Sequence, residues 1–172
     1  GDWIQYEKFF YMAQNLSFLE SLNSNLVYVY INKLANYFGI QYYGVNFICA
    51  SIFMFSLAFF LNDTKNRWLA LAIAFPIIIL ILGMGYIRQG LAFSFSLFLI
   101  KSLEEKKLLN SLLFYSLSVL THKSALFISS LLLFIFLWYH KKYFFLLLTI
   151  SIPTFFALIF RDFYQHNIHN YI

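Results

Sequence analysis

Apolar residues dominate most of this chain and occur in blocks separated by short polar segments. Six largely uncharged runs can be delimited, at 43–61, 68–87, 88–100, 108–121, 124–139 and 143–160. An α-helix of roughly 20 apolar residues crosses a bilayer core about 30 Å thick, so runs of this kind predict membrane-spanning helices. We therefore expect an all-α fold, a polytopic transmembrane helix bundle with about six membrane segments.

The third, fourth and fifth runs are short for a membrane span. Either their helices begin below the membrane surface and line a cavity, or the flanking residues Arg88, His122 and Lys123 belong to the helices. Both interpretations place charge at membrane depth, where it is costly.

Small residues and prolines add detail to the predicted helices. Small side chains recur at intervals of four, at Gly90 and Ser94 and at Thr121, Ala125 and Ser129. Such spacing allows neighbouring helices to approach closely. Pro76 and Pro153 are expected to kink the second and sixth helices, because proline removes a backbone donor.

Residues 1–42 follow a different pattern, with apolar positions spaced as on one face of a helix. The first stripe is Trp3, Tyr6, Phe10 and Ala13, and the second is Val27, Ile31, Leu34 and Phe38. We expect two amphipathic helices joined by a turn between Asn15 and Asn25, with Asn32 and Lys33 away from the second stripe. They rest on the outer membrane surface or form a lid that faces substrate. The chain thus divides into an outer-side segment, 1–42, and a transmembrane bundle, 43–172.

Composition and charge narrow the class of protein. With 62% apolar and 11% charged residues, the chain has too few polar side chains to cover a water-soluble domain. Lysine and arginine collect at alternate joints, 62–67, 101–107 and 140–142, which predicts that these joints face the cytoplasm. They account for most of the net charge of +5. Without a basic stripe bearing base-stacking aromatics, no nucleic-acid partner is expected.

Three smaller observations complete the outline. The first residue is Gly1 rather than Met, so we expect an internal piece of a longer multi-pass chain. The single cysteine, Cys49, falls in an apolar run and predicts packing rather than a disulfide or a cysteine metal cluster. His166 and His169 lack the further ligands of a metal site, so no metal is expected.

Arg88 is the sharpest candidate for function. An arginine at membrane depth generally faces protein, water or a bound anion, and its planar guanidinium suits phosphate oxygens. Snorkelling to lipid headgroups or pairing with a carboxylate would also explain it. His122 and Lys123 interrupt another joint at similar depth, or form an ordinary outer loop. Ser124 lies two residues from His122, so a Ser-His nucleophile pair on a continuous helix is not supported.

Two motifs together resemble the EpsG-like branch of the Wzy-type polysaccharide polymerases. They are Gly-Met-Gly-Tyr-Ile-Arg-Gln-Gly-Leu-Ala at 83–92 and Leu-Thr-His-Lys-Ser-Ala at 120–125. The opening Gly1-Asp2-Trp3 with Tyr6 resembles the segment that follows the first membrane helix of that family. The resemblance covers nearly the whole chain, which corresponds to about half a family member.

This resemblance implies an enzyme, a multi-pass glycosyltransferase of the bacterial cytoplasmic (inner) membrane. Such an enzyme joins oligosaccharide repeat units carried on undecaprenyl pyrophosphate into an exopolysaccharide, capsule or O-antigen on the outer side. Its partners would be the lipid-linked oligosaccharide, membrane lipid and other polysaccharide-assembly proteins, and neither metal nor cofactor is implied.

The implied roles fall on seven residues. Arg88, His122 and Asp2 are the expected catalytic residues, and Lys123, Gln89, Tyr6 and Ser124 are expected to bind substrate. Arg88, and then Lys123, would contact pyrophosphate. His122 or Asp2 would accept the proton of the attacking sugar hydroxyl. Trp3 would stack on a sugar or simply pack.

Two other functions are compatible with the same residues. A related membrane glycan ligase or glycosyltransferase would keep this chemistry and change the acceptor. A lipid-linked oligosaccharide transporter would also present cations in a membrane cavity, but with charges accessible from both sides. A purely structural subunit would leave Arg88 unexplained.

Overall fold

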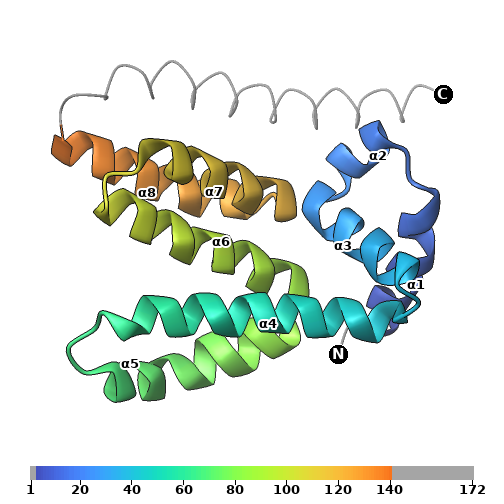
Figure 1. The fold of residues 1–172 in the computed structure, drawn as a ribbon, viewed down its shortest axis with the longest axis horizontal. Coiled ribbons are helices and arrows are strands. Elements are labelled where there is room, and N and C mark those ends of the chain that lie inside the picture. Colours follow the sequence, from blue (N-terminus) through green and yellow to red (C-terminus); the bar gives the residue numbers. More distant parts are fainter. Residues whose placement is uncertain (1–2, 141–172) are drawn as a thin grey trace, which may run out of the picture. The chain divides into compact units, whose positions relative to one another are not determined.

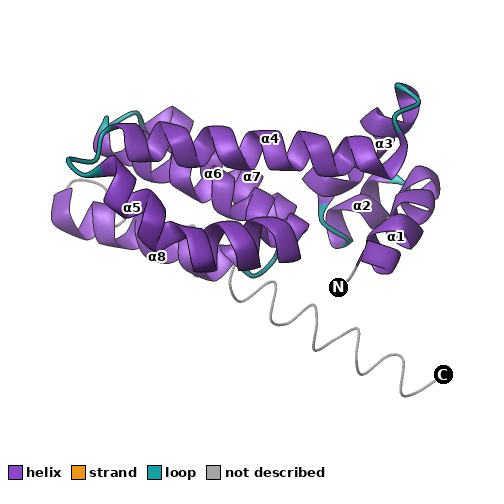
Figure 2. Ribbon diagram, turned by 90° about the horizontal axis from the view of Figure 1, so that it is seen from below, coloured by secondary structure: helices purple, strands orange, loops and turns teal. Residues whose placement is uncertain are grey.

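The computed structural model describes residues 3–140, and the side chains of 4–136, of the 172-residue chain. Within this range every regular element is helical, which confirms the predicted all-α class (Figure 2). The elements are α1 (Trp3–Asn15), α2 (Phe18–Asn23), α3 (Leu26–Tyr37), α4 (Gln41–Asn62), α5 (Arg67–Ala74), the π-helix η1 (Phe75–Gly83), α6 (Ile87–Glu104), α7 (Leu108–Thr121) and α8 (Ala125–His140). The sixth predicted run, 143–160 with Pro153, lies outside the described residues, as do His166 and His169.

The predicted apolar runs coincide closely with the described helices. How many of these helices cross the membrane is a separate question. One helix, Gln41–Asn62, is long and apolar enough to cross a membrane. The apolar helices Arg67–Gly83, Leu108–Thr121 and Ala125–Phe136 are shorter. On α4, Phe47 and Phe55 are 74% and 66% exposed, an apolar exterior that fits lipid better than water. The count of six spans therefore stays a prediction.

The polar residues that flank the short runs belong to a helix at one joint and to a turn at the other. Arg88 lies in the first turn of α6, so there the polar flanking residue belongs to the helix. His122 and Lys123 instead lie in the turn between α7 and α8. Where a kink was predicted at Pro76, the helix changes from α-type to π-type hydrogen bonding, and Pro76 lies in the first turn of η1.

The helices that surround Arg88 all belong to one compact unit, residues 1–129, while residues 130–172 form a second. In the first unit α6 packs against both α4 and α7, while α1 and α3 pack together at one end of these long helices (Figure 1). A core at this end contains Tyr6, Phe10, Tyr28, Cys49 and Leu91. Cys49 is buried there as a packing residue, as its apolar surroundings predicted.

Charged residues lie at both ends of the long helices. At one end the Lys101 ammonium bonds the Asp63 carboxylate at 2.8 Å, which brings the joints 62–67 and 101–107 together. At the other end Arg88 lies against α1 and α3. This arrangement fits the predicted alternation of joints, although which end faces the cytoplasm stays a prediction.

The N-terminal segment contains three helices rather than two. The stretch expected to be a turn between Asn15 and Asn25 includes α2, which begins at a capping box. The Ser17 amide donates to Glu20 Oε2 at 2.8 Å, and the Glu20 amide donates to Ser17 Oγ at 3.4 Å. These reciprocal bonds satisfy donors that the first turn of a helix otherwise leaves free, and so stabilise even a helix of six residues.

The first predicted apolar stripe is confirmed at its three described side chains, and the second is only half correct, because Val27 and Ile31 are half-buried against the core. Tyr6, Phe10 and Ala13 of the first stripe are all buried. The other two residues of the second stripe, Leu34 and the α3 C-cap residue Phe38, are 49% and 65% exposed, so the stripe is wrong for them.

The buried face of α3 lies one position later along the helix. It is formed by Tyr28, Val29, Asn32 and Ala35. Tyr28 turns toward the aromatic rings of α1, and Asn32 becomes tolerable in the interior because its Nδ2 donates to the Tyr28 carbonyl at 2.6 Å. The tertiary contact with α1 thus overrides the apolar periodicity, and Asn32, predicted to lie outside, is buried.

Small residues line the contacts of α6 and α7, as their spacing predicted. Gly90, Ser94, Thr121 and Ser129 are all buried. Three hydroxyl groups also meet between helices, with Ser96 Oγ 2.9 Å from Ser118 Oγ and 3.2 Å from Ser129 Oγ. Within a bilayer the hydrophobic effect does not drive helices together, because lipid tails are as apolar as the helices. Hydrogen bonds between hydroxyl groups of this kind then help to hold the helices in contact.

Candidate functional site

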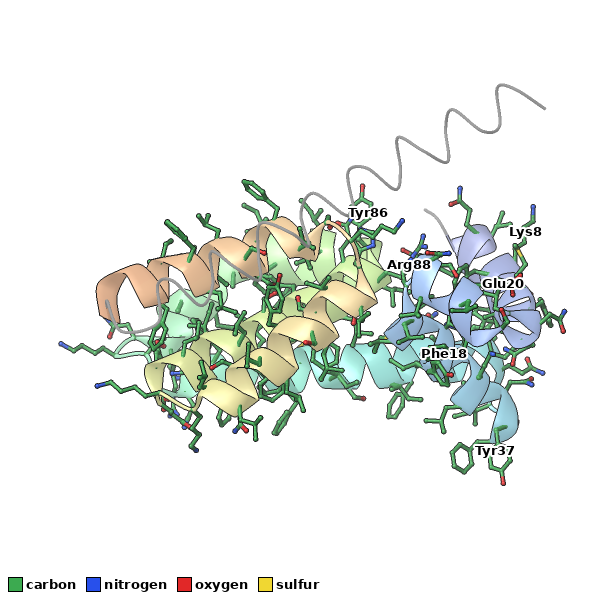
Figure 3. All side chains as sticks on the ribbon, turned by 90° about the horizontal axis from the view of Figure 1, so that it is seen from above. Lys8, Phe18, Glu20, Tyr37, Tyr86 and Arg88 are labelled. Atoms are coloured by element: carbon green, nitrogen blue, oxygen red, sulfur yellow. The ribbon has the colours of Figure 1, made fainter. Side chains whose placement is uncertain are left out.

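Arg88 projects from the start of α6 toward the N-terminal helices (Figure 3). Its position follows from the turn before it, because Gly90 lets α6 approach the end of η1. A Cβ at Gly90 would lie only 3.1 Å from the Leu82 carbonyl oxygen. The close approach directs the first turn of α6, with the half-buried Arg88, against α1 and α3.

Three aromatic rings surround the guanidinium group of Arg88. Its Cζ lies 5.5 Å from the centroids of the Tyr6 and Phe9 rings and 6.0 Å from that of Tyr28. The rings also pack on one another, with centroids 5.4 Å apart for Phe9 and Tyr28 and 6.4 Å apart for Tyr6 and Tyr28. We call Tyr6, Phe9 and Tyr28 the aromatic cage. It holds a cation by the negative faces of its rings, at about 0.5–2 kcal/mol for each favourable contact.

The cage leaves the hydrogen-bonding capacity of Arg88 unused. Among the side chains that the structure describes, Arg88 has neither an ion pair nor a hydrogen bond. Contacts with aromatic rings take up none of the five N–H donors of a guanidinium in hydrogen bonds to oxygen acceptors. The group is therefore fixed in place with donors available for an oxyanion.

His122 lies near Arg88 at the C-terminal end of α7. Its amide donates to the Ser118 carbonyl at 3.2 Å, which caps the helix, and the residue is half-buried. Nδ1 is buried and has no hydrogen-bond partner among the described residues. Burial, and secondly the charge of Arg88, lower the pKa of His122 below its ordinary value of 6.5. The ring is thus neutral at pH 7 and can accept a proton.

The other predicted residues occupy different environments. Lys123 and Ser124 are exposed in the turn after His122, and Gln89 is half-buried beside Arg88. Ser124 forms no bond with His122 in the described structure, so a Ser-His pair is not supported there either. Asp2 and the Trp3 side chain lie outside what the structure describes. Convergence of Arg88, His122 and Lys123 on one outward-open cavity stays a prediction.

Two members of the aromatic cage were missed by the sequence reasoning. Phe9 lies one position before Phe10 of the predicted stripe, and Tyr28 one position after Val27. The only available signal was the spacing of three between Tyr6 and Phe9, which places both rings on one side of a helix. Within residues 3–140, no three His, Cys, Asp or Glu side chains gather as metal ligands.

Comparison with known proteins identifies the family. The model of the EpsG family matches residues 1–171. The chain belongs to the EpsG family. This is a family of membrane polysaccharide polymerases, which confirms the resemblance of the 83–92 and 120–125 motifs. No curated protein and no solved structure gave a significant match to this EpsG-family chain.

Proposed function

We propose that this EpsG-family chain polymerises oligosaccharide repeat units carried on undecaprenyl pyrophosphate, on the outer side of the bacterial cytoplasmic membrane. The observation that carries the proposal is that Arg88, held by aromatic rings and without a carboxylate partner among residues 3–140, lies near enough to the neutral ring of His122 to lower its pKa. A cation for the anionic leaving group and a proton acceptor are what this glycosyl transfer requires.

In the proposed reaction, a hydroxyl oxygen of the acceptor sugar attacks the anomeric carbon of the donor. The new C–O bond forms as the bond between that carbon and the pyrophosphate oxygen breaks, and the bonding electron pair leaves with the lipid pyrophosphate. The hydroxyl proton passes to the imidazole of His122, or to Asp2. The products are a polymer longer by one repeat and undecaprenyl pyrophosphate.

Arg88 is the group that we assign to the leaving pyrophosphate, with exposed Lys123 as a second cation. The backbone amides in the first turn of α6 add to the positive potential of Arg88, because the N-cap residue Tyr86 supplies no side-chain capping bond to them. Uncapped amides at a helix N-terminus favour anions, and charge on the leaving oxygen grows in the transition state. The cations therefore lower the barrier rather than only bind substrate.

The contacts of Tyr6 change its proposed role from binding sugar to positioning Arg88. Tyr6 is buried and its ring contacts the Arg88 guanidinium, so we assign it to holding Arg88 rather than to stacking on a sugar. Gln89 and Ser124 keep their proposed role as donors and acceptors for sugar hydroxyls.

The test is the length of surface polysaccharide made by cells that carry the full-length gene with Arg88→Ala or His122→Ala. We expect long chains to disappear on a gel while single repeat units accumulate, at unchanged membrane abundance of the protein. Lys65→Ala, which removes an exposed cation from the opposite end of the helices, is the matched control. Wild-type chain lengths in both site variants would refute the assignment. If single repeat units disappeared together with the long chains, the defect would lie in transport rather than in polymerisation.

A further inference from the structure

A second feature of the molecule lies at the opposite end of the long helices, between α4 and α5. It is a groove of about 410 Å³, within the range of about 300–1,000 Å³ found for small-molecule sites. Its walls include Leu57, Leu61, Leu71 and the ring of Trp68, and its polar lining residues are Asn62 and Arg67. The groove thus combines a hydrocarbon-like wall with a cation at one end, which fits an amphiphile.

The charges around this groove favour an anionic head group. Arg67 stacks on Trp68, with Cζ 5.8 Å from the ring centroid, and forms no ion pair among the described residues. The nearest carboxylate in sequence, Asp63, is engaged by Lys101 at 2.8 Å and so is largely neutralised. Arg67 also begins α5, whose N-cap Asn66 makes no side-chain capping bond. Cation, helix N-terminus and free amides all attract negative charge.

The residues beside the groove indicate its level in the membrane, and this level indicates the source of the ligand. Trp68 is 73% exposed, and tryptophan beside arginine at the end of an apolar helix is typical of the headgroup level of a bilayer. The same joint, 62–67, is rich in lysine and arginine and is expected to face the cytoplasm. We propose that the groove binds an anionic phospholipid of the inner leaflet, with an acyl chain against Leu57 and Leu71 and the phosphate on Arg67.

The probe for this site is the fluorescence of Trp68 in nanodiscs, quenched by acyl-brominated phospholipids. The chain contains three tryptophans, so Trp3→Phe and Trp138→Phe leave Trp68 as the sole fluorophore. We expect brominated phosphatidylglycerol to quench several-fold more strongly than brominated phosphatidylcholine at equal mole fraction, and the preference to weaken at high salt. Arg67→Gln should abolish the preference, whereas Lys65→Gln, which removes a cation outside the groove lining, should retain it.

If the Arg67→Gln protein does not accumulate in the membrane, a variant that fills the groove provides a second test. Ala58→Phe narrows the apolar wall without touching a charge, and should reduce the preference for phosphatidylglycerol. Equal quenching by both lipids would overturn the proposal, as expected for ordinary annular lipid or for a second protein copy covering the groove. A preference that survives Arg67→Gln would also overturn it. None of these readouts depends on polymerase activity.

Discussion

The guanidinium of Arg88 lies close enough to His122 for its charge to lower the pKa of the imidazole. The two residues are 34 positions apart and come from different helices, α6 and the end of α7. The arrangement places a cation within electrostatic range of a neutral base. Removing one should therefore change a measurable property of the other.

Arg88→Gln should raise the pKa of His122, because the substitution removes a positive charge that disfavours protonation. Burial, the larger cause, remains, so the pKa should stay below 6.5. The measurement is a pH titration of ¹³C-labelled histidine by NMR in detergent or nanodiscs. The His122→Gln variant assigns the His122 signal among the four histidines of the chain. An unchanged pKa in Arg88→Gln would show that the two groups do not interact.

The same shift sets the direction of a pH effect on stability. The folded pKa of His122 is lowered, so the unfolded chain binds more protons below pH 6.5 and the folded state loses stability as the pH falls. His122→Gln should remove this acid-side loss. Thermal unfolding of both proteins at pH 7.5 and pH 5.5 checks the effect, and an equal drop in both would exclude His122 as its source.

The sequence predicted the long helices well because polar residues mark their ends. α4 and α7 match the runs 43–61 and 108–121 closely, since polar residues interrupt the apolar pattern at both boundaries. The short helix α2 was missed because it depends on the local capping box of Ser17 rather than on periodicity.

The candidate site was only partly predictable, for a physical reason. Arg88 and His122 can be found from sequence because charge within apolar segments is costly and conspicuous. The cage residues Phe9 and Tyr28 cannot, since aromatic residues are common throughout this chain and only the packing of α1 and α3 brings these rings to Arg88. Asn32 was misplaced for the same reason, because its burial is set by the neighbour of α3 rather than by its own polarity.

Asn32→Leu should stabilise the protein by about 1 kcal/mol, an unusual result for a buried position. Asn32 is 1% exposed, and its Oδ1 has no hydrogen-bond partner among the described residues. Leucine of similar shape removes that unsatisfied acceptor, which outweighs loss of the Nδ2 bond to the Tyr28 carbonyl. Thermal unfolding in detergent measures the effect, with exposed Asn36→Leu as control. A lower melting temperature for Asn32→Leu than for the control would mean that Oδ1 has a partner.

Ser118→Ala should destabilise the helix contacts by about 1 kcal/mol, the scale of hydrogen bonds between membrane helices. Ser118 Oγ donates to the Ala92 carbonyl at 2.9 Å and lies 3.1 Å from Ser129 Oγ. The matched control is Ser116→Ala on the same helix, because within the described part of the chain exposed Ser116 bonds only the Leu112 carbonyl of its own helix, at 2.9 Å. Equal melting temperatures for the two variants would show that the contact between helices contributes nothing.

Gly90→Ala should both destabilise the protein and shorten the polysaccharide. The added Cβ would lie 3.1 Å from the Leu82 carbonyl oxygen, a backbone atom that moves only if η1 and α6 separate. Overpacking of this kind costs about 1–3 kcal/mol. Separation would also move Arg88, two residues earlier in α6, away from the aromatic cage. Thermal unfolding and gel analysis of surface polysaccharide measure the two effects.

Gly85→Ala separates this steric effect from a general intolerance of alanine near the site. A Cβ at Gly85 would meet no atom of the described residues within 4 Å, and Gly85 lies in the connection between η1 and α6, five residues before Gly90. We therefore expect near-wild-type melting temperature and chain length for Gly85→Ala. If Gly90→Ala were equally silent, the close approach of α6 to η1 would not be what positions Arg88, and the geometry assigned to the site would be wrong.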